Sequence, residues 1–198
     1  MHSSESHPQT ASNVKNCTSS LHQELESLLI PEMQAIRSAD DYARILQWFY
    51  GFISPLEIGI EQHIKSEILP DIAERKKSHL ILQDLVVLGS SITDIPINDD
   101  LPDIQHQEQA IGAMYVLEGS TLGGKVIANM LTKNAAGFKF STHYFTAYGK
   151  ETGSKWRIFL DLMNQYQSTE QVETIIETAN ETFLKFRNWI QLNQHTIK

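Results

Sequence analysis

The chain has 198 residues, of which 41% are hydrophobic, so it is long enough for one domain with a sizeable core. Its 24 acidic and 16 basic residues give a formal net charge of −8, which argues against binding nucleic acids or anionic membranes through a general basic field. The single cysteine, Cys17, excludes an internal disulfide and a cysteine-based metal cluster. With no apolar signal core and no run of about 20 apolar residues, these features favour a cytoplasmic protein outside the membrane.

Hydrophobic residues recur every three or four positions along almost the whole chain, which predicts helices. We expect residues 1–12 to form a disordered polar tail and residues 13–198 to form one helical domain. The first helix should be capped by Ser12 or Asn13 and should stop before Pro31.

A second helix is predicted from near Asp40 toward Pro70, with Pro55 kinking or dividing it. A third spans about residues 79–88 and should end at Gly89, because glycine favours the left-handed backbone that follows many helices.

Residues 90–102 are rich in turn formers and predict a surface loop. Helical spacing resumes near Gln105 and continues to about Leu131, and an aromatic loop with room for short extended pieces follows at 138–149.

Two final helices carry the remaining periodic hydrophobic residues, one around Phe159 and one from Val172 to Ile190. Because strands and helices do not alternate, a parallel sheet is not expected. The predicted fold class is all-α.

Common catalytic motifs are missing from the sequence: it has no phosphate loop, dinucleotide fingerprint, nucleophile elbow, HExxH or paired Glu-x-x-His. Among eight histidines, His22 differs because it lies at the margin of the first apolar stripe, one turn from both Thr18 and Glu26. It is either a ligand whose second nitrogen is oriented by Glu26 or water, or an ordinary boundary histidine.

Three glycines, Gly119, Gly123 and Gly124, interrupt an otherwise helical pattern. Each glycine inside a helix costs about 1 kcal/mol relative to alanine, so something should compensate. Gly119 and Gly123 lie on one face and could let two helix backbones approach closely. Alternatively, the helix bends over a flat ligand that meets bare backbone.

The segment GAMYVLEGSTLGGKVI at 112–127 resembles the distal-helix signature of bacterial haem oxygenases, in particular those that accompany bacterial phytochromes. VKNCTSSLHQELESLL at 14–29 is similar to the proximal helix of the same family. The resemblance implies the haem oxygenase fold, a helical bundle with haem between the first helix and the glycine-bearing helix.

By this resemblance, His22 would be the proximal ligand of the haem iron, and the oxygen side would be formed by Gly119, Ser120, Gly123 and Gly124. The other haem-binding residues that the resemblance implies are Lys15, Thr18, Glu26 and Phe183. Further candidates for contact with the haem carboxylates are Lys155 and Arg157, which flank Trp156, and the Tyr115 hydroxyl. One position departs from the animal-type pattern, because Ser120 replaces an aspartate that organises distal water. Small residues and backbone suit an oxygenase pocket, which should lack a strong acid–base side chain beside the bound oxygen.

The implied reaction converts haem, which is both cofactor and substrate, into biliverdin, Fe²⁺ and CO with O₂ and external electrons. A ferredoxin or flavin reductase would supply the electrons, and a bacterial phytochrome could receive the biliverdin. Two alternatives stay open at this point: a non-catalytic haem-binding or sensing protein, and a thiamine-salvage hydrolase-like enzyme. The hydrolase would use Cys17, whose place on the first apolar stripe predicts burial and low reactivity.

Overall fold

The computed structural model describes residues 9–134 and 137–195, and this part of the chain is helical without any strand. The all-α prediction is therefore confirmed. The elements are α1 (Thr10–Ala35), α2 (Ala39–His63), α3 (Ile72–Arg75), α4 (Ser78–Val87), α5 (Gln107–Asn134), the 3₁₀ turn η1 (Gly149–Glu151), α6 (Thr152–Met163) and α7 (Thr169–His195).

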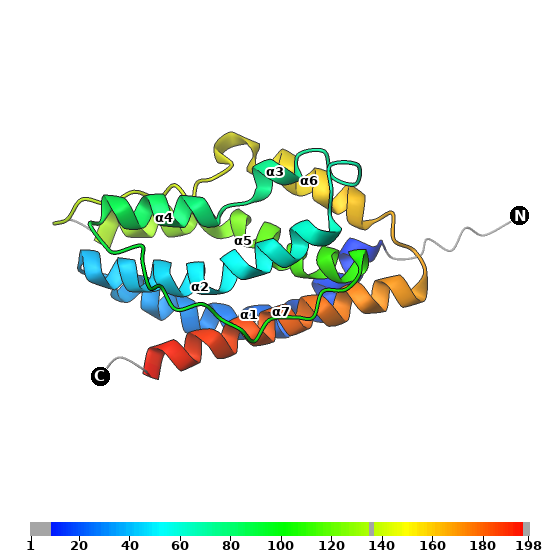
Figure 1. The fold of residues 1–198 in the computed structure, drawn as a ribbon, viewed down its shortest axis with the longest axis horizontal. Coiled ribbons are helices and arrows are strands. Elements are labelled where there is room, and N and C mark those ends of the chain that lie inside the picture. Colours follow the sequence, from blue (N-terminus) through cyan, green and yellow to red (C-terminus); the bar gives the residue numbers. More distant parts are fainter. Residues whose placement is uncertain (1–8, 135–136, 196–198) are drawn as a thin grey trace, which may run out of the picture.

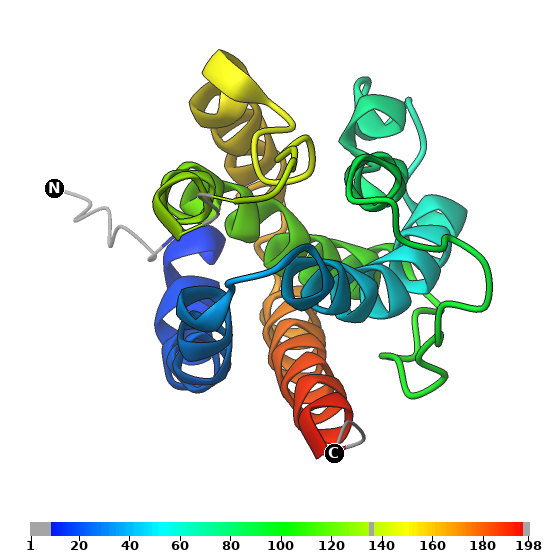
Figure 2. The same cartoon turned by 90° about the vertical axis from the view of Figure 1, so that its left-hand side faces the viewer.

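Helices α1, α5 and α7 run in the same direction and begin at the same end of the bundle (Figure 1). The first residue of α1, Thr10, donates a hydrogen bond to the Tyr166 carbonyl oxygen, and Gln107 at the start of α5 donates one to the Tyr166 hydroxyl. Tyr166 itself lies just before α7. Figure 2 shows the bundle nearly end on, with α1 and α4 on opposite sides.

Helix α1 is longer at both ends than the sequence predicts. It begins at Thr10, within the segment assigned to the tail, and its N-cap residue Gln9 makes no side-chain cap bond, so the expected caps Ser12 and Asn13 are wrong. The helix also continues through Pro31 to Ala35. Met33 and Ile36, which follow the proline, are buried, and this burial outweighs the backbone hydrogen bond that proline cannot make. Residues 1–8 of the expected tail lie outside the described residues.

Helix α2 begins with a capping box. The Ser38 hydroxyl accepts a hydrogen bond from the Asp41 amide at 3.1 Å, and the Asp41 carboxylate accepts one from the Ser38 amide at 3.0 Å. Pro55 lies inside the helix without dividing it, and α2 ends at His63, short of the predicted end near Pro70. On its buried side Phe52 stacks on Phe186 of α7, with ring centroids 4.5 Å apart.

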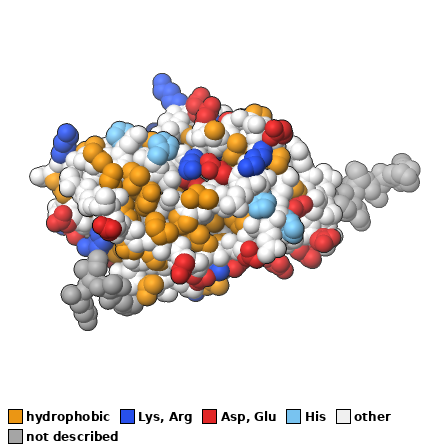
Figure 3. Space-filling view, in the orientation of Figure 1, with side chains coloured by type: hydrophobic (Ala, Val, Ile, Leu, Met, Phe, Trp, Pro, Cys, Tyr) orange, Lys and Arg blue, Asp and Glu red, His pale blue; other side chains and the backbone are white. Residues whose placement is uncertain are grey.

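The end of α4 agrees with the sequence, because Gly89 has φ +73° and the helix stops at Val87. Residues 88–106 then form the predicted surface loop, which crosses α2 at Gly51, where the Asn98 amide donates to the Gly51 carbonyl oxygen at 2.9 Å. Figure 3 shows hydrophobic side chains over the middle of this face, where the loop runs in Figure 1. Exposed hydrophobic residues of the loop include Ile92 and Ile97.

The aromatic loop at 138–149 contains turns and none of the extended pieces that the sequence allowed. It is held by the fully buried carboxylate of Asp84 on α4. This carboxylate accepts hydrogen bonds from the Ser141 hydroxyl at 2.6 Å, the His143 amide at 2.9 Å and the Tyr144 amide at 3.0 Å. The loop is thereby fixed against the rest of the bundle.

Candidate functional site

The predicted iron ligand His22 on α1 and the first distal glycine, Gly119 on α5, each lie one helical turn after a contact between these two helices. The Thr18 side chain of α1 and the Tyr115 hydroxyl of α5 lie next to each other, and burial raises the pKa of Tyr115 while Thr18 acts in the opposite direction. Four residues further along these parallel helices come His22 and Gly119. Because both helices rise by about 1.5 Å per residue, His22 and Gly119 lie at a similar level of the bundle.

The His22 side chain is 52% exposed, which leaves the imidazole accessible. Its Nε2 atom lies 3.4 Å from Glu26 Oε1 on the next turn of α1. On the other side, its ring centroid lies 5.4 Å from that of Phe183 on α7. The structure thus brings together three of the predicted haem-site residues from two helices.

The three glycines of α5 differ in their surroundings. A methyl group added to Gly123 would meet no atom within 4 Å beyond its own stretch of helix, and one added to Gly119 would make only an ordinary contact with Trp156 at 3.8 Å. By contrast, a methyl group on Gly124 would overlap the Phe145 carbonyl oxygen of the aromatic loop. Close packing therefore explains Gly124 and does not explain Gly119 or Gly123. The close approach of α5 to α7 occurs elsewhere, at Gly112.

Gly119 and Gly123 lie on a stripe of the α5 surface that other parts of the protein do not cover closely. Leu122 and Val126, at the helical spacings that continue this stripe, are 49% and 65% exposed. An exposed apolar stripe next to bare backbone is what a flat apolar ligand would cover. This stripe and the accessible His22 are the observations that fit haem, because the stripe offers a surface free of Cβ atoms and the imidazole offers an iron ligand.

Ser120 is exposed, and its hydroxyl donates to the Leu117 carbonyl oxygen at 2.7 Å. The Tyr144 side chain of the aromatic loop lies next to it. Burial raises the pKa of Tyr144, and the neighbouring Ser120 hydroxyl acts in the opposite direction. Tyr144 is a neighbour of the site that the sequence did not reveal, because it lies in a loop without a recognisable pattern.

The predicted cationic residues differ in availability. Lys15 and Arg157 are exposed. The ammonium group of Lys155, in contrast, lies 2.9 Å from Asp71 Oδ2 and 2.9 Å from Glu74 Oε2. Although burial on its own lowers the pKa of Lys155, these two carboxylates outweigh it and raise that pKa. Lys155 therefore already has two carboxylate partners within the protein.

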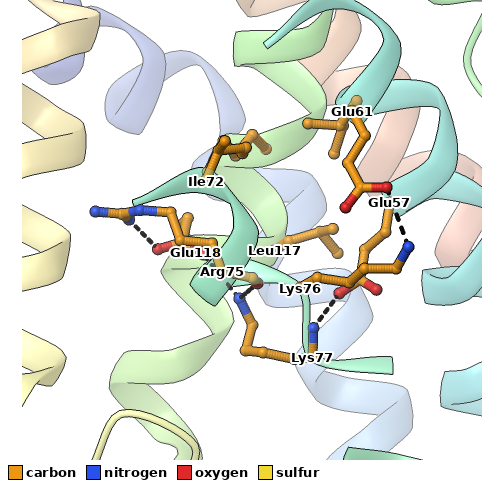
Figure 4. Close-up of a pocket in the computed structure, with 10 residues that line it drawn as sticks. Glu57, Glu61, Ile72, Arg75, Lys76, Lys77, Leu117 and Glu118 are labelled. Atoms are coloured by element: carbon orange, nitrogen blue, oxygen red, sulfur yellow. Dashed lines mark hydrogen bonds and ion pairs between the residues drawn. The ribbon is translucent and has the colours of Figure 1, made fainter. Parts of the chain in front are cut away.

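A cluster of ion pairs, which was not predicted, centres on Glu118, the residue before Gly119. The Glu118 side chain is 1% exposed and accepts hydrogen bonds from Arg75 at 2.5 Å, Lys77 at 2.7 Å and the Tyr148 hydroxyl at 2.7 Å. Figure 4 shows Glu118 of α5 facing Arg75 at the end of α3. Burial and the Glu118 charge raise the pKa of Tyr148, so its hydroxyl stays protonated and donates.

A small cavity of about 20 Å³ adjoins the cluster. Glu57 of α2 lines it and is buried, with its carboxylate accepting from the Lys77 amide at 2.6 Å and the Ser78 amide at 3.2 Å. These amides lie at the start of α4, where backbone donors lack partners within the helix, so Glu57 acts as its cap from another helix.

Cys17 is exposed, so its predicted burial is wrong. Within residues 9–134 and 137–195, no group of three or more His, Cys, Asp or Glu side chains could hold a metal ion. None of the helices in the described part of the chain is long and apolar enough to cross a membrane.

Comparisons with known proteins agree on one family. The family described as Heme oxygenase matches residues 9–192. A haem oxygenase of Xanthomonas campestris pv. campestris is 31% identical over 150 residues, which cover 75% of this chain and 87% of that protein.

Among solved structures, the NO- and CO-bound haem oxygenase of Neisseria meningitidis has a TM-score of 0.75 at 20% identity, covering 94% of this chain and 92% of that one. The haem oxygenase of Leptospira interrogans also gives 0.75, at 17% identity, with 93% and 100% covered. A Synechocystis haem oxygenase in complex with haem gives 0.73 at 17% identity, with 93% and 92% covered. The family match over nearly the whole chain and the bacterial relative establish that this protein belongs to the haem oxygenase family.

Proposed function

We propose that this haem oxygenase binds haem between α1 and the open stripe of α5 and cleaves it to biliverdin, Fe²⁺ and CO. The observation that carries the placement is the bare surface at Gly119 and Gly123. Each glycine costs about 1 kcal/mol of helix stability, and neither is needed for packing within the protein. A flat ligand on this surface gives both glycines a physical reason.

His22 is the proposed iron ligand. Its side chain is accessible, and Glu26 and Phe183 restrict the orientation of the imidazole from two sides. A neutral histidine suits oxygenase chemistry better than a thiolate, which promotes cleavage of the O–O bond. Phe183 is buried on α7, so it presents an edge fixed by the core.

The distal side of the proposed pocket consists of backbone and small side chains. Bound haem supplies the iron that takes up O₂ and the porphyrin carbon that is oxidised. The protein contributes a surface with no carboxylate or imidazole between Gly119 and Gly124. The Ser120 hydroxyl already donates to a backbone carbonyl oxygen, which leaves its oxygen free to accept a hydrogen bond from water. We propose that Ser120 and Tyr144 together order water on this side.

The proposed partners of the haem carboxylates are Lys15 and Arg157, because both are exposed cationic side chains. The Tyr115 hydroxyl and the Thr18 side chain lie next to each other, so we propose that they fix the contact between α1 and α5 at the edge of the pocket.

Electrons must come from another protein, because no flavin or nicotinamide motif is present in the sequence. We propose a ferredoxin or flavin reductase as the donor, a cytoplasmic location, and a bacterial phytochrome as one possible recipient of biliverdin. The same reaction would also serve iron acquisition.

The test is a titration of the purified protein with hemin, followed by ascorbate or reduced ferredoxin in air. We expect a Soret band to form with one equivalent of hemin and then to disappear as a biliverdin band grows. A stable complex that never yields biliverdin would instead show a non-catalytic haem binder, and the lack of any hemin complex would refute the proposal.

A further inference from the structure

The open stripe of α5 raises the question of what holds this part of the helix in place. Gly119 and Gly123 contribute almost no side-chain packing on the front of the stripe. The position of the backbone must therefore be set from other faces of the helix, by the residues that flank the glycines.

One fixed point is Glu118. Its buried carboxylate binds Arg75 and Lys77, which come from the α3–α4 junction, and the Tyr148 hydroxyl, which comes from the end of the aromatic loop. Lys77 also donates to Tyr148 at 3.0 Å, so these groups form a closed ring of hydrogen bonds.

Through Arg75 the ring is tied to the start of α3 and to α6. The Arg75 guanidinium donates to Asp71 at 2.8 Å and to the Lys155 carbonyl oxygen of α6 at 3.1 Å. Arg75 is almost fully buried, so the loss of a carboxylate partner would leave a buried charge uncompensated. This makes Glu118 a rigid attachment of α5 to α3, α4 and α6.

The second fixed point is Gly124, where the Phe145 carbonyl oxygen packs directly against the helix backbone. Phe145 belongs to the loop that Asp84 holds through the Tyr144 amide. The bare segment from Gly119 to Gly123 is thus bracketed by a charged attachment at one end and a close backbone contact at the other.

We propose that Glu118 is a positioning residue for haem: through Arg75, Lys77 and Tyr148 it sets the height of the Gly119–Gly123 backbone above the porphyrin. This inference rests on the proposed placement of haem against that backbone. Glu118 acts from behind the helix and touches neither haem nor its ligands.

Two variants test the proposal at different strengths. Tyr148→Phe removes one hydroxyl and keeps the ring, whose centroid lies 4.8 Å from the Lys77 ammonium and 5.5 Å from that of Lys155. Glu118→Gln removes the charge and keeps one acceptor oxygen. The matched control is Glu61→Gln. Glu61 lines the same cavity, and its carboxylate pairs at 3.0 Å with the partly exposed Lys76.

Three measurements are made on each protein: thermal unfolding without hemin, hemin affinity from the Soret titration, and the C–O stretching frequency of the ferrous CO complex. We expect Glu118→Gln to weaken hemin binding about tenfold or more, as for changes behind other metal sites, and to shift or broaden the C–O band. Tyr148→Phe should shift the band in the same direction and lower the unfolding temperature less than Glu118→Gln does, because it leaves the buried charges paired. Glu61→Gln should behave as wild type in all three measurements.

The C–O band separates positioning from stability, because a variant that is merely less stable keeps the wild-type band in its folded fraction. Unchanged bands in Tyr148→Phe and in folded Glu118→Gln would overturn the proposal. So would an unfolded Glu118→Gln combined with a wild-type band in Tyr148→Phe. Failure of the proposed function would look different, since the wild-type protein itself would then form no hemin complex.

Discussion

Substitution by alanine should have opposite effects at Gly123 and Gly124 on the stability of the hemin-free protein. A methyl group on Gly123 would enter open space, so Gly123→Ala should gain the helix propensity of alanine, about 1 kcal/mol. For a chain of this length, this corresponds to an increase in Tm of about 2–4 °C. A methyl group on Gly124 would overlap the Phe145 carbonyl oxygen, so Gly124→Ala should destabilise the fold by about 1–3 kcal/mol.

Although Gly123→Ala should stabilise the hemin-free protein, it should weaken the binding of hemin. If the porphyrin lies against this backbone, the added methyl group overpacks the interface by about 1–3 kcal/mol, or roughly 5- to 150-fold in Kd. The assay combines circular dichroism melting of the hemin-free protein with a Soret titration. A Gly123→Ala protein that is more stable and yet binds hemin with wild-type affinity would refute the placement of haem on this stripe. A Gly123→Ala protein that is less stable would refute the claim that the site has room for a side chain.

Three further predictions follow from the other side chains. His22→Ala should change the stability of the hemin-free protein by no more than about 0.5 kcal/mol, because the side chain is half exposed. It should alter the absorption spectrum of the ferric hemin complex, and added imidazole should restore that spectrum. A wild-type spectrum in the variant would rule out His22 as the ligand. Glu57→Gln should destabilise the protein by about 1–2 kcal/mol through loss of the α4 cap, measured by urea unfolding, and an effect as small as that of Glu61→Gln would contradict the capping role. Although burial raises the pKa of the Asp71 carboxyl, hydrogen bonds from Arg75 and Lys155 outweigh it and hold that pKa below its usual 3.8. The ionised carboxylate therefore stabilises the fold above pH 3.8, and this stabilisation is lost as the pH falls through the lowered pKa. The destabilisation caused by Asp71→Asn should be largest near neutral pH and should shrink below pH 3.8. A stability difference between wild type and Asp71→Asn that does not depend on pH would contradict the ion pairing.

The sequence predicts most helices of the fold because their hydrophobic spacing is regular, and the end of α4 at Gly89 follows from local chemistry alone. The errors occur where tertiary packing overrides local preference. Pro31 should end a helix, yet burial of Met33 and Ile36 carries α1 onward. Helix α3, with four residues, is too short to show a period.

The proximal and distal motifs identify the family, and the structure adds that Gly119 and Gly123, unlike Gly124, are free of close packing. The cluster around Glu118 stays hidden in the sequence because Arg75 and Lys77 lie in a charged run that is typical of a solvated surface. One available signal is Glu118 itself, a single carboxylate between hydrophobic residues of the α5 pattern. Lys155 shows the converse problem, since its charge alone does not reveal that Asp71 and Glu74 already bind it.

The parallel arrangement of α1, α5 and α7 also determines when, during synthesis of the chain, the fold can be completed. Helix α1 makes hydrogen bonds to residues far along the chain. Thr10 binds Tyr166, which lies 156 positions later, and Glu24 binds Arg187, which lies 163 positions later. During synthesis on the ribosome, His22 and the glycines of α5 emerge long before the helix that carries Phe183. The frame that sets the distance between α1 and α5 is therefore complete only when α7 has docked, so on the proposed placement haem would be taken up only by finished chains.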